Sequence, residues 1–447
     1  MKKQFYFICL SLCASSSFAV DLFQTYQAAL AYNADYLKAI ANNQAGQEQQ
    51  NIARAALLPQ IGANATVSEN YFNQNGITAY YHQPTYGVQF SQVMVDYGKF
   101  STYVKGKFAS QLADLQLINA RQQLMVGVSQ AYMDVLFAGD KLLATQMTKT
   151  ALDQQMKQAE AAFKVGTVTI ADVNDAKAAY DAALAQEIQD TNNVIYKKNI
   201  FRNLTGLDPD SIQPLQEQIN LVMPSPQSDA QWWAIAESGN LNIKIAGKQV
   251  DMAREDISIS RSGHYPTLSL QAQYQYQDTS NLDAGNISPE MIPLLSYPGG
   301  PMSTYGTGAA MLQLSIPISS GGAVSSQTRQ AADNYNAAQQ QLVSTERKTN
   351  QQVVNAYWQV ANGVSLVNSQ KTALLSAKTK LKSDQRGYEV GIRNSVDLVS
   401  SQKTYYDTFQ TYQQSRYQYL MAEINLQYLS GTIDEKFLQQ INANIKQ

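Results

Sequence analysis

One half of this chain repeats the other, and the repeat constrains the fold more than any other feature. The phrase Phe163-Lys164-Val165-Gly166 returns as Tyr388-Glu389-Val390-Gly391, a separation of 225 residues (391 minus 166). The pairs that share this separation are Gly166 and Gly391, Asp172 and Asp397, and Gly206 and Gly431. Self-similarity at one spacing indicates two copies of one supersecondary unit. We therefore expect a first structural repeat over residues 20–230 and a second over residues 231–447.

Residues 1–19 have the pattern of a secretory signal peptide. The basic start, the apolar run and the small-residue end are Lys2-Lys3, Phe5 to Leu12 and Ala19. Both cysteines, Cys9 and Cys13, lie in this segment, so no disulfide is expected after it. The remainder carries 31 basic residues (33 minus 2) against 35 acidic ones, which gives no indication of nucleic-acid binding.

Each repeat is predicted to contain a helix, two strands and a long helical hairpin, in that order. The opening helix of the first repeat is expected over Leu22 to Ala56. The strands follow from alternating apolar and polar residues, as in Ile61 to Ser68 and Leu268 to Tyr276. They are expected at about 59–72 and 85–95 in the first repeat, and at about 265–278 and 306–318 in the second.

The segments after the strands contain no proline and are predicted as helix, except at Val-Gly turns. Proline is absent from Thr85 to Asp208 and from Ile318 to the end. The arm from Lys99 to Val165 would extend about 100 Å at roughly 1.5 Å per residue. The hairpins would turn near Gly166 and Gly391, where glycine suits a positive φ. In the second arm, small and apolar residues spaced by threes and fours from Tyr335 to Val367 favour coiled-coil packing.

The four strands have the length of outer-membrane barrel strands, which need roughly 9 to 11 residues. Four strands cannot close, because barrels begin at about eight strands. Either they form an ordinary soluble sheet, or several chains contribute strands to one barrel, and a trimer would supply twelve. A soluble sheet would make the chain a secreted or periplasmic coiled-coil structural or adhesive protein. A porin is disfavoured, because it encodes a whole barrel in one chain and has no use for such long helices.

The sequence gives no support for an enzyme. The only histidines are His82 and His264, cysteine is absent after Cys13, and no phosphate-binding glycine loop occurs. We therefore expect no catalytic residue, no metal site and no cofactor.

The chain resembles the TolC family of outer-membrane channels, which serve drug efflux and type I secretion. The matching phrases are Leu57-Leu58-Pro59-Gln60, Phe163 to Gly166 before Asp172-Val173, Pro317-Ile318 before Gly321-Gly322, and Tyr388 to Arg393 before Val396-Asp397. The resemblance implies a mainly α-helical fold with a membrane β-barrel. A homotrimer would form a twelve-stranded barrel in outer-membrane lipid and a coiled-coil tunnel through the periplasm. Its partners would be a periplasmic adaptor (membrane fusion) protein and an inner-membrane efflux pump or ABC exporter.

The resemblance also assigns functions to residues at the hairpin tips. Asp397 would face the tunnel axis, so that three copies form an acidic ring at the entrance that attracts cations. Relatives carry a second acid where this chain has Ser400, so a weaker ring is expected. Tyr388 and Arg393 would tie one hairpin to the other through Asp172, as a gating network.

Other features leave alternatives open at the tips. Relatives can offer a hydroxyl where this chain has Ala171, which weakens the expected network. Asp172 and Asp397 also follow Thr169 and Asn394 by three residues, the spacing of a helix capping box, so capping alone is an alternative for both. For Arg393 the alternative is a solvated turn residue. The turns at Gly166 and Gly391 would contact the adaptor.

Overall fold

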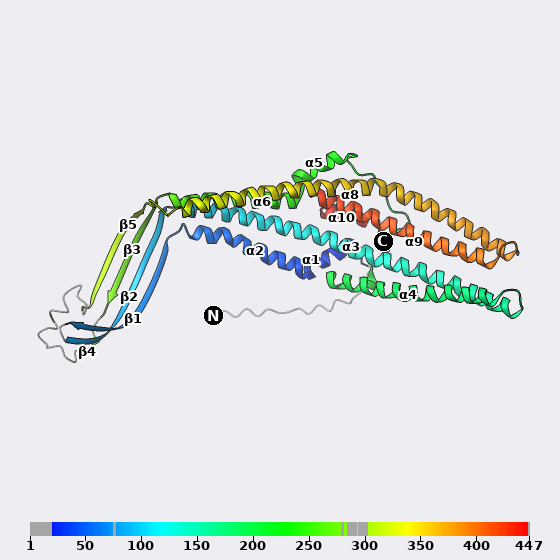
Figure 1. Ribbon diagram of the computed structural model, residues 1–447, viewed down its shortest axis with the longest axis horizontal. Helices are drawn as coiled ribbons and strands as arrows, with labels where there is room; N and C mark the ends of the chain where they lie inside the picture. Colours follow the sequence, from blue (N-terminus) through cyan, green and yellow to red (C-terminus); the bar gives the residue numbers. More distant parts are fainter. Residues whose placement is uncertain (1–19, 75–76, 279–280, 284–292, 294–302, 446–447) are drawn as a thin grey trace, which may run out of the picture. The chain divides into compact units, whose positions relative to one another are not determined.

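The computed structural model describes residues 20–74, 77–278, 281–283, 293 and 303–445, and it is mainly helical with one antiparallel sheet (Figure 1). The predicted signal peptide lies outside the described residues. The helices are α1 (Leu22–Tyr32), α2 (Ala34–Ala55), α3 (Tyr97–Lys164), α4 (Ile170–Thr205), α5 (Asp229–Gly239), α6 (Leu241–Arg261), α8 (Ala323–Glu389), α9 (Ser395–Ser430) and α10 (Glu435–Asn442). The strands are β1 (Gln60–Gln74), β2 (Ile77–Val95), β3 (Thr267–Gln277), β4 (Asn281–Asp283) and β5 (Tyr305–Ser315).

The chain divides into two compact units that do not coincide with the two sequence repeats. The hairpin unit comprises residues 1–41, 115–244 and 344–447, and the sheet unit comprises residues 42–114 and 245–343. Each unit therefore takes segments from both repeats. Among the described residues, none of the helices is both long enough and apolar enough to cross a membrane.

The sheet has the strand order β1-β2-β3-β5, and β4 pairs with one end of β2. The register places residues of one kind next to each other across all four strands. One row is Ile61, Phe90, Ala272 and Ala310, and the adjacent row, on the opposite face, is Gly62, Gln89, Gln273 and Ala309. Because side chains alternate between faces, the sheet has one apolar and one polar face. β1 and β5 are the ends of the strand order.

Two strand bounds differ clearly from the sequence prediction. β2 begins at Ile77, not near residue 85, because its first half pairs with β1 from Gln74 with Ile77 to Val67 with Pro84. Pro84 lies one residue beyond the first pair of β2 with β3, Thr85 with Gln277, so that ladder does not require its missing N–H. β5 ends at Ser315, not residue 318.

Three segments expected to be continuous helix are interrupted. Asn33 separates α1 from α2, and its side-chain oxygen accepts a hydrogen bond from the Tyr36 N–H at 2.9 Å. Asn240 separates α5 from α6 in the same way, accepting from the N–H groups of Asn242 and Ile243. Near the C-terminus, α9 ends at Gly431 with a φ of 74°, and α10 follows. In each case a local cap provides hydrogen-bond partners for backbone groups at the helix end, which lack a partner within the helix.

The hairpin unit contains two helical hairpins and a shared core. α3 has 68 residues and α8 has 67, and the returning helices α4 and α9 have 36 each (Figure 1). The largest fully buried side chains come mainly from α1, α3, α4 and α9, and include Tyr26, Tyr132, Phe201, Tyr419 and Leu420. Burial of Thr349, Val353, Ala356, Val360 and Val367 confirms the predicted seam within this part of α8.

Candidate functional site

The tip of the α3/α4 hairpin ends in a complete capping box. The Asp172 N–H donates to the Thr169 hydroxyl at 3.3 Å, and the Asp172 carboxylate accepts from the Thr169 N–H and hydroxyl at 2.8 Å each. The backbone hydrogen bond first, and then the hydroxyl, hold the pKa of Asp172 below its ordinary value. The capping box predicted for Asp172 is confirmed. Within the chain, the Asp172 carboxylate thus caps the N-terminus of its own helix, α4.

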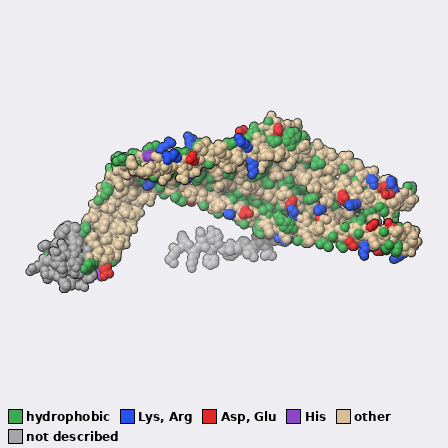
Figure 2. Space-filling model, in the orientation of Figure 1, with side chains coloured by type: hydrophobic (Ala, Val, Ile, Leu, Met, Phe, Trp, Pro, Cys, Tyr) green, Lys and Arg blue, Asp and Glu red, His purple; other side chains and the backbone are tan. Residues whose placement is uncertain are grey.

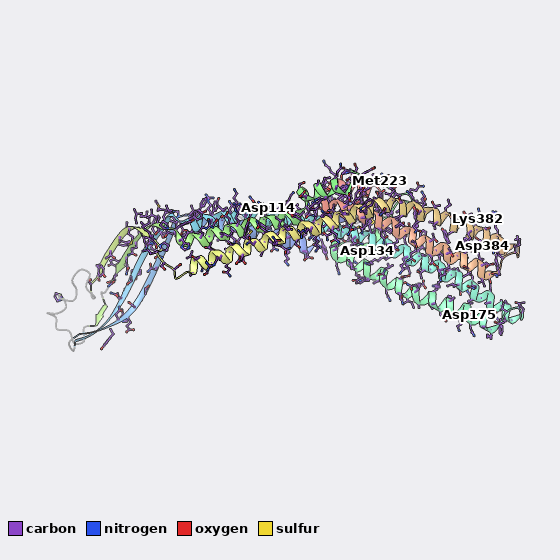
Figure 3. The ribbon with its side chains drawn as sticks, turned by 45° about the horizontal axis from the view of Figure 1, so that its top comes forward. Asp114, Asp134, Asp175, Met223, Lys382 and Asp384 are labelled. Carbon is purple, nitrogen blue, oxygen red and sulfur yellow. The ribbon has the colours of Figure 1, made fainter. Side chains whose placement is uncertain are left out.

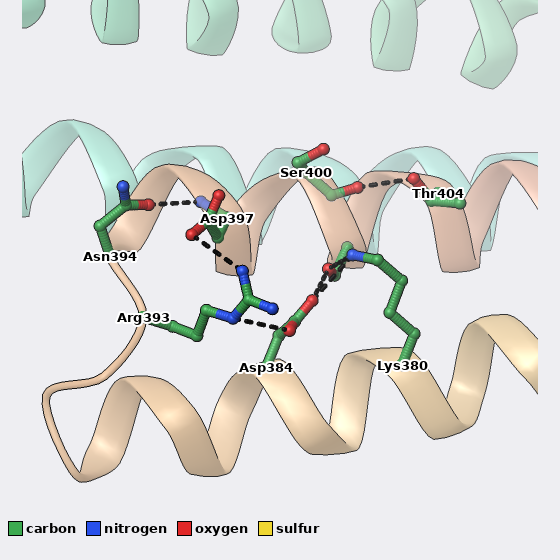
Figure 4. A network of polar contacts seen from close by, with 8 residues as sticks. Lys380, Asp384, Arg393, Asn394, Asp397, Ser400 and Thr404 are labelled. Carbon is green, nitrogen blue, oxygen red and sulfur yellow. Dashed lines mark hydrogen bonds and ion pairs between the residues drawn. The ribbon is translucent and has the colours of Figure 1, made fainter.

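The tip of the α8/α9 hairpin uses its equivalent aspartate differently. The Asp397 N–H donates to the Asn394 side chain at 2.8 Å, so half of the predicted capping box is present. The carboxylate instead forms an ion pair with Arg393, with 3.7 Å between Oδ2 and Nη1 (Figure 4). Two residues at matching positions of the repeat therefore have different partners.

Arg393 also contacts a second carboxylate, that of Asp384 on α8. The Arg393 Nε lies 3.6 Å from Asp384 Oδ1 (Figure 4). Asp384 Oδ2 accepts from the Lys380 ammonium at 2.8 Å and from the Ser401 hydroxyl, and Lys380 also donates to Ser401. The Asp384 side chain is only 8% exposed. The hydrogen bond from Lys380, and next that from Ser401, lower the pKa of Asp384, which keeps its charge available to Arg393.

The structure brings some of the predicted tip residues together and not others. Arg393 meets Asp397, but among the described residues it forms no ion pair with Asp172. Tyr388 is partly buried at the end of α8, and its carbonyl accepts the Gly391 N–H at 3.1 Å. Ser400 is exposed on the first turns of α9 (Figure 4).

Both tip glycines adopt the backbone conformation predicted for them. Gly166 has a φ of 75° and Gly391 has a φ of 77°. A Cβ atom at either position would meet nothing within 4 Å. The requirement for glycine here is therefore conformational, because no neighbouring atom limits the space.

Sequence reasoning missed Lys380, Asp384 and Ser401. Figure 3 shows Asp384 toward the turn that joins α8 and α9. The repeat itself carried a signal, since subtracting 225 places Asp384 opposite Ala159 and Ser401 opposite Ala176. A charged residue at a position that is alanine in the other copy indicates a specific partner inside the hairpin.

The chemistry of both tips is ionic and hydrogen-bonding. Acidic and basic side chains are spread along the two hairpins and reach their ends (Figure 2). Within the described part of the chain, no group of three or more His, Cys, Asp or Glu residues is placed to hold a metal ion. These tips therefore offer charged side chains and ion pairs for a contact with another molecule.

The comparisons with known proteins agree on one family. Residues 25–207 and 233–432 match the family model described as outer membrane efflux protein. Outer membrane protein TolC of Escherichia coli (strain K12) is 33% identical over 435 residues, covering 97% of this chain and 86% of the relative. Proteases secretion protein PrtF of Dickeya chrysanthemi is 26% identical, covering 98% of this chain and 93% of the relative.

Solved structures agree with this fold. The outer membrane protein VceC of Vibrio cholerae has a TM-score of 0.74 at 16% identity, covering 92% of this chain and 96% of that one. The CmeC outer membrane channel of Campylobacter jejuni has a TM-score of 0.75 at 16% identity, covering 95% and 90%. With a family model matched across both repeats, the chain belongs to the outer membrane efflux protein family.

Proposed function

We propose that this protein is an outer-membrane channel that extends into the periplasm and exports drugs, proteins or both. The observation that carries the proposal is the family match, which includes both helical hairpins and every described strand of the sheet. Relatives include an efflux pump outer membrane protein of Pseudomonas putida and the protease secretion protein of Dickeya chrysanthemi. Passage through a channel requires no chemical step, so we propose no catalytic activity.

We further propose that three copies close one twelve-stranded barrel in the outer membrane. A sheet of four long strands is too narrow to close alone, and β1 and β5 are available to pair with neighbouring copies. Ile61 is 75% exposed and Leu312 is 67% exposed, both on the apolar face. A soluble sheet would cover such side chains, whereas lipid would solvate them. This favours the channel over a secreted coiled-coil rod.

The test is the location and assembly of the full chain. The protein should fractionate with outer membranes, migrate as a heat-sensitive trimer in mild detergent and form conducting pores in planar bilayers. Recovery as a soluble monomer without conductance would favour the structural rod instead.

A periplasmic adaptor and an inner-membrane pump or ABC exporter are the proposed partners at the hairpin tips. Exposed apolar residues flank both tip glycines, namely Val165, Ile170, Val390 and Ile392. Such residues on a surface that must otherwise face water support a contact with protein. Valine at Gly166 or Gly391 should weaken cross-linking to the adaptor, since a β-branched residue resists positive φ. Asparagine, which tolerates that conformation, is the matched control.

At the tip itself we propose an acidic ring of three Asp397 side chains and a gate in which Arg393 and Tyr388 bind Asp172 of an adjacent hairpin. Support comes from Arg393, which already contacts two carboxylates and retains further N–H donors. Because Ser400 supplies no second acid, cation preference should be modest.

Asp172→Ala or Arg393→Ser should increase single-channel conductance in planar bilayers, because each removes one side of the proposed gate. Lys382→Gln, which neutralises an exposed lysine near the same turn (Figure 3), is the control and should leave conductance unchanged. The gate is rejected if both tip variants conduct like the wild type.

A further inference from the structure

The α8/α9 tip contains a charge cluster whose centre is buried, and the proposed gate does not account for it. Asp384 projects from α8 toward α9 and receives hydrogen bonds from Lys380 on its own helix and Ser401 on the facing helix. Two donors from different helices fix the carboxylate in one position. Its other oxygen, Oδ1, faces the Arg393 Nε. A fixed anion therefore lies behind a more mobile cation, whose side chain is 54% exposed.

The backbone next to this cluster also holds Arg393 against its own hairpin. The Arg393 N–H donates to the Gly387 carbonyl at 3.1 Å. A Cβ atom at residue 387 would lie 2.7 Å from Arg393 Cγ. Any side chain here would thus push the aliphatic part of Arg393 away, and only glycine permits its present path.

The other hairpin provides an internal comparison, because it lacks every part of this arrangement. At the separation of 225 residues, Asp384, Gly387, Arg393 and Ser401 correspond to Ala159, Ala162, Val168 and Ala176. Ala176 is buried, so the facing position is an interior one in both hairpins. A helical hairpin of this family therefore forms with small apolar residues at these positions. The first hairpin thus shows what the arrangement looks like without this set of residues.

These observations identify a positioning group for the gate. We infer that Asp384, held by Lys380 and Ser401, fixes the Nε edge of Arg393 while Nη1 faces Asp397 of the same hairpin at 3.7 Å, and that Nη2 is thereby directed outward, toward a carboxylate on another hairpin. The guanidinium is planar and presents its donors in a fixed fork, so holding one edge sets the direction of the other. This inference rests on the proposed channel function and adds a residue set that controls its opening.

The test is a double-mutant cycle on single-channel conductance in planar bilayers, with the full-length trimer. Asp384→Asn keeps the shape and removes the charge, and it leaves Lys380 solvated, so the trimer should still assemble. Its conductance should rise, by less than that of Arg393→Ser. In the double variant, Asp384→Asn should add nothing to Arg393→Ser, because its effect acts only through Arg393.

Two further variants change the other residues that position Arg393. Ser401→Ala and Gly387→Ala introduce the residues that the first hairpin already carries, and both should raise conductance only when Arg393 is present. Glu389→Gln, which removes an exposed acid near the same helix end, is the control and should conduct like the wild type.

A spin label provides a readout that does not depend on conductance. Cysteine is absent after Cys13, so Ile392→Cys introduces a unique label site beside Arg393. Mobility of the label should increase in Asp384→Asn and remain unchanged in Glu389→Gln.

Several results would overturn the inference. The first is an unchanged or lowered conductance in Asp384→Asn. The second is an equal change in conductance from Asp384→Asn with and without Arg393. The third is a spin label whose mobility does not increase in Asp384→Asn. If Arg393→Ser itself has no effect on conductance, the inference fails with the gate, yet the channel stands as long as the wild type conducts. If the wild-type protein forms no pores, the proposed function itself is rejected.

Discussion

Glu423, on α9, is an ionisable residue whose environment opposes its charge. Burial raises the pKa of Glu423 from 4.5 to about 7, and the hydrogen bond with Tyr419 offsets only part of this rise. A carboxyl group whose pKa is higher in the folded than in the unfolded chain contributes stability below the unfolded value. That contribution is lost as the pH rises through about 7. The hairpin unit should therefore be less stable at pH 8 than at pH 5.

Glu423→Gln should remove this pH dependence, since a neutral amide has the same shape and no charge to bury. At pH 8 the variant should be more stable by up to about 3 kcal/mol, from roughly 1.4 kcal/mol for each pKa unit. At pH 4 both proteins should melt alike. Thermal unfolding of the full-length protein, followed by circular dichroism from pH 4 to 8, measures the difference. A constant gap at every pH would contradict the assignment.

Single residues also show which parts of the site the sequence could predict. The capping role of Asp172 was predictable because its partner, Thr169, is three residues away, and spacing alone specifies the contact. Asp384 and Ser401 are 17 residues apart on facing helices, and their contact depends on the rotation of both helices about their axes. Local spacing does not encode that rotation. Only a position-by-position comparison of the two repeats would have indicated it.

At the scale of elements, two asparagines interrupt helical segments that the apolar periodicity of the sequence would predict as continuous. Asn33 and Asn240 are 207 residues apart, and each ends one helix and caps the next. Asn240 is only 2% exposed, and its side chain additionally donates to the Leu429 carbonyl at 2.7 Å. Asn33 is buried as well, but within the described contacts its side chain serves one N–H group.

Alanine at the two positions should therefore have unequal effects. Asn33→Ala loses a helix cap and should cost about 1 kcal/mol. Asn240→Ala loses a cap and leaves the half-buried Leu429 carbonyl without this donor, so it should cost about 2 to 3 kcal/mol. Thermal unfolding of each variant compares the two losses directly. Equal losses would show that the Leu429 contact contributes nothing.

The strands illustrate the same limit for elements. Their alternation was enough to place β1 and β3, whereas the first half of β2, which contains Pro84, was not predicted as strand. The dipeptide Asn75-Gly76, a strong hairpin signal, stood directly before that segment in the sequence. Giving that turn signal more weight than the proline would have extended the strand to Ile77.

For the whole molecule, the central question is which environment each face of the sheet meets. Ala309 and Ala310 are adjacent on β5, both exposed, and point to opposite faces. Ala310 pairs with Ala272 in the apolar row, and Ala309 pairs with Gln273 in the polar row. Introducing the same substitution at either position therefore tests the two faces separately, at neighbouring sites that both carry alanine.

Lysine at Ala310 should impair assembly in the outer membrane, since a charge facing lipid costs about 2 to 4 kcal/mol near the bilayer midplane. Lysine at Ala309 should be tolerated, because that face would line water. The amount of heat-sensitive trimer recovered from outer membranes checks both. If both variants assemble equally well, the apolar face does not meet lipid.

The proposed twelve-stranded assembly follows from the sequence as arithmetic, because four strands are too few for a barrel and three chains give twelve, and it stays a prediction. The division into units was not predictable in this way. The repeats follow the order of the chain, whereas the compact units join the corresponding parts of both repeats. Contacts between distant segments decide that grouping, and a linear pattern does not record them.

The polar rows of the sheet have a consequence for cargo. From Gly62 to Ser68 on β1 and from Ser269 to Gln277 on β3, every second side chain is an amide, a hydroxyl or hydrogen, and none is ionic. A polar face of this kind offers solutes many weak and equivalent hydrogen-bonding groups, and these rows contain no charged side chain that would bind a solute in one place. In the proposed pore, solutes of either charge would pass along this face without being bound, so any selection among them would depend on the hairpin tips.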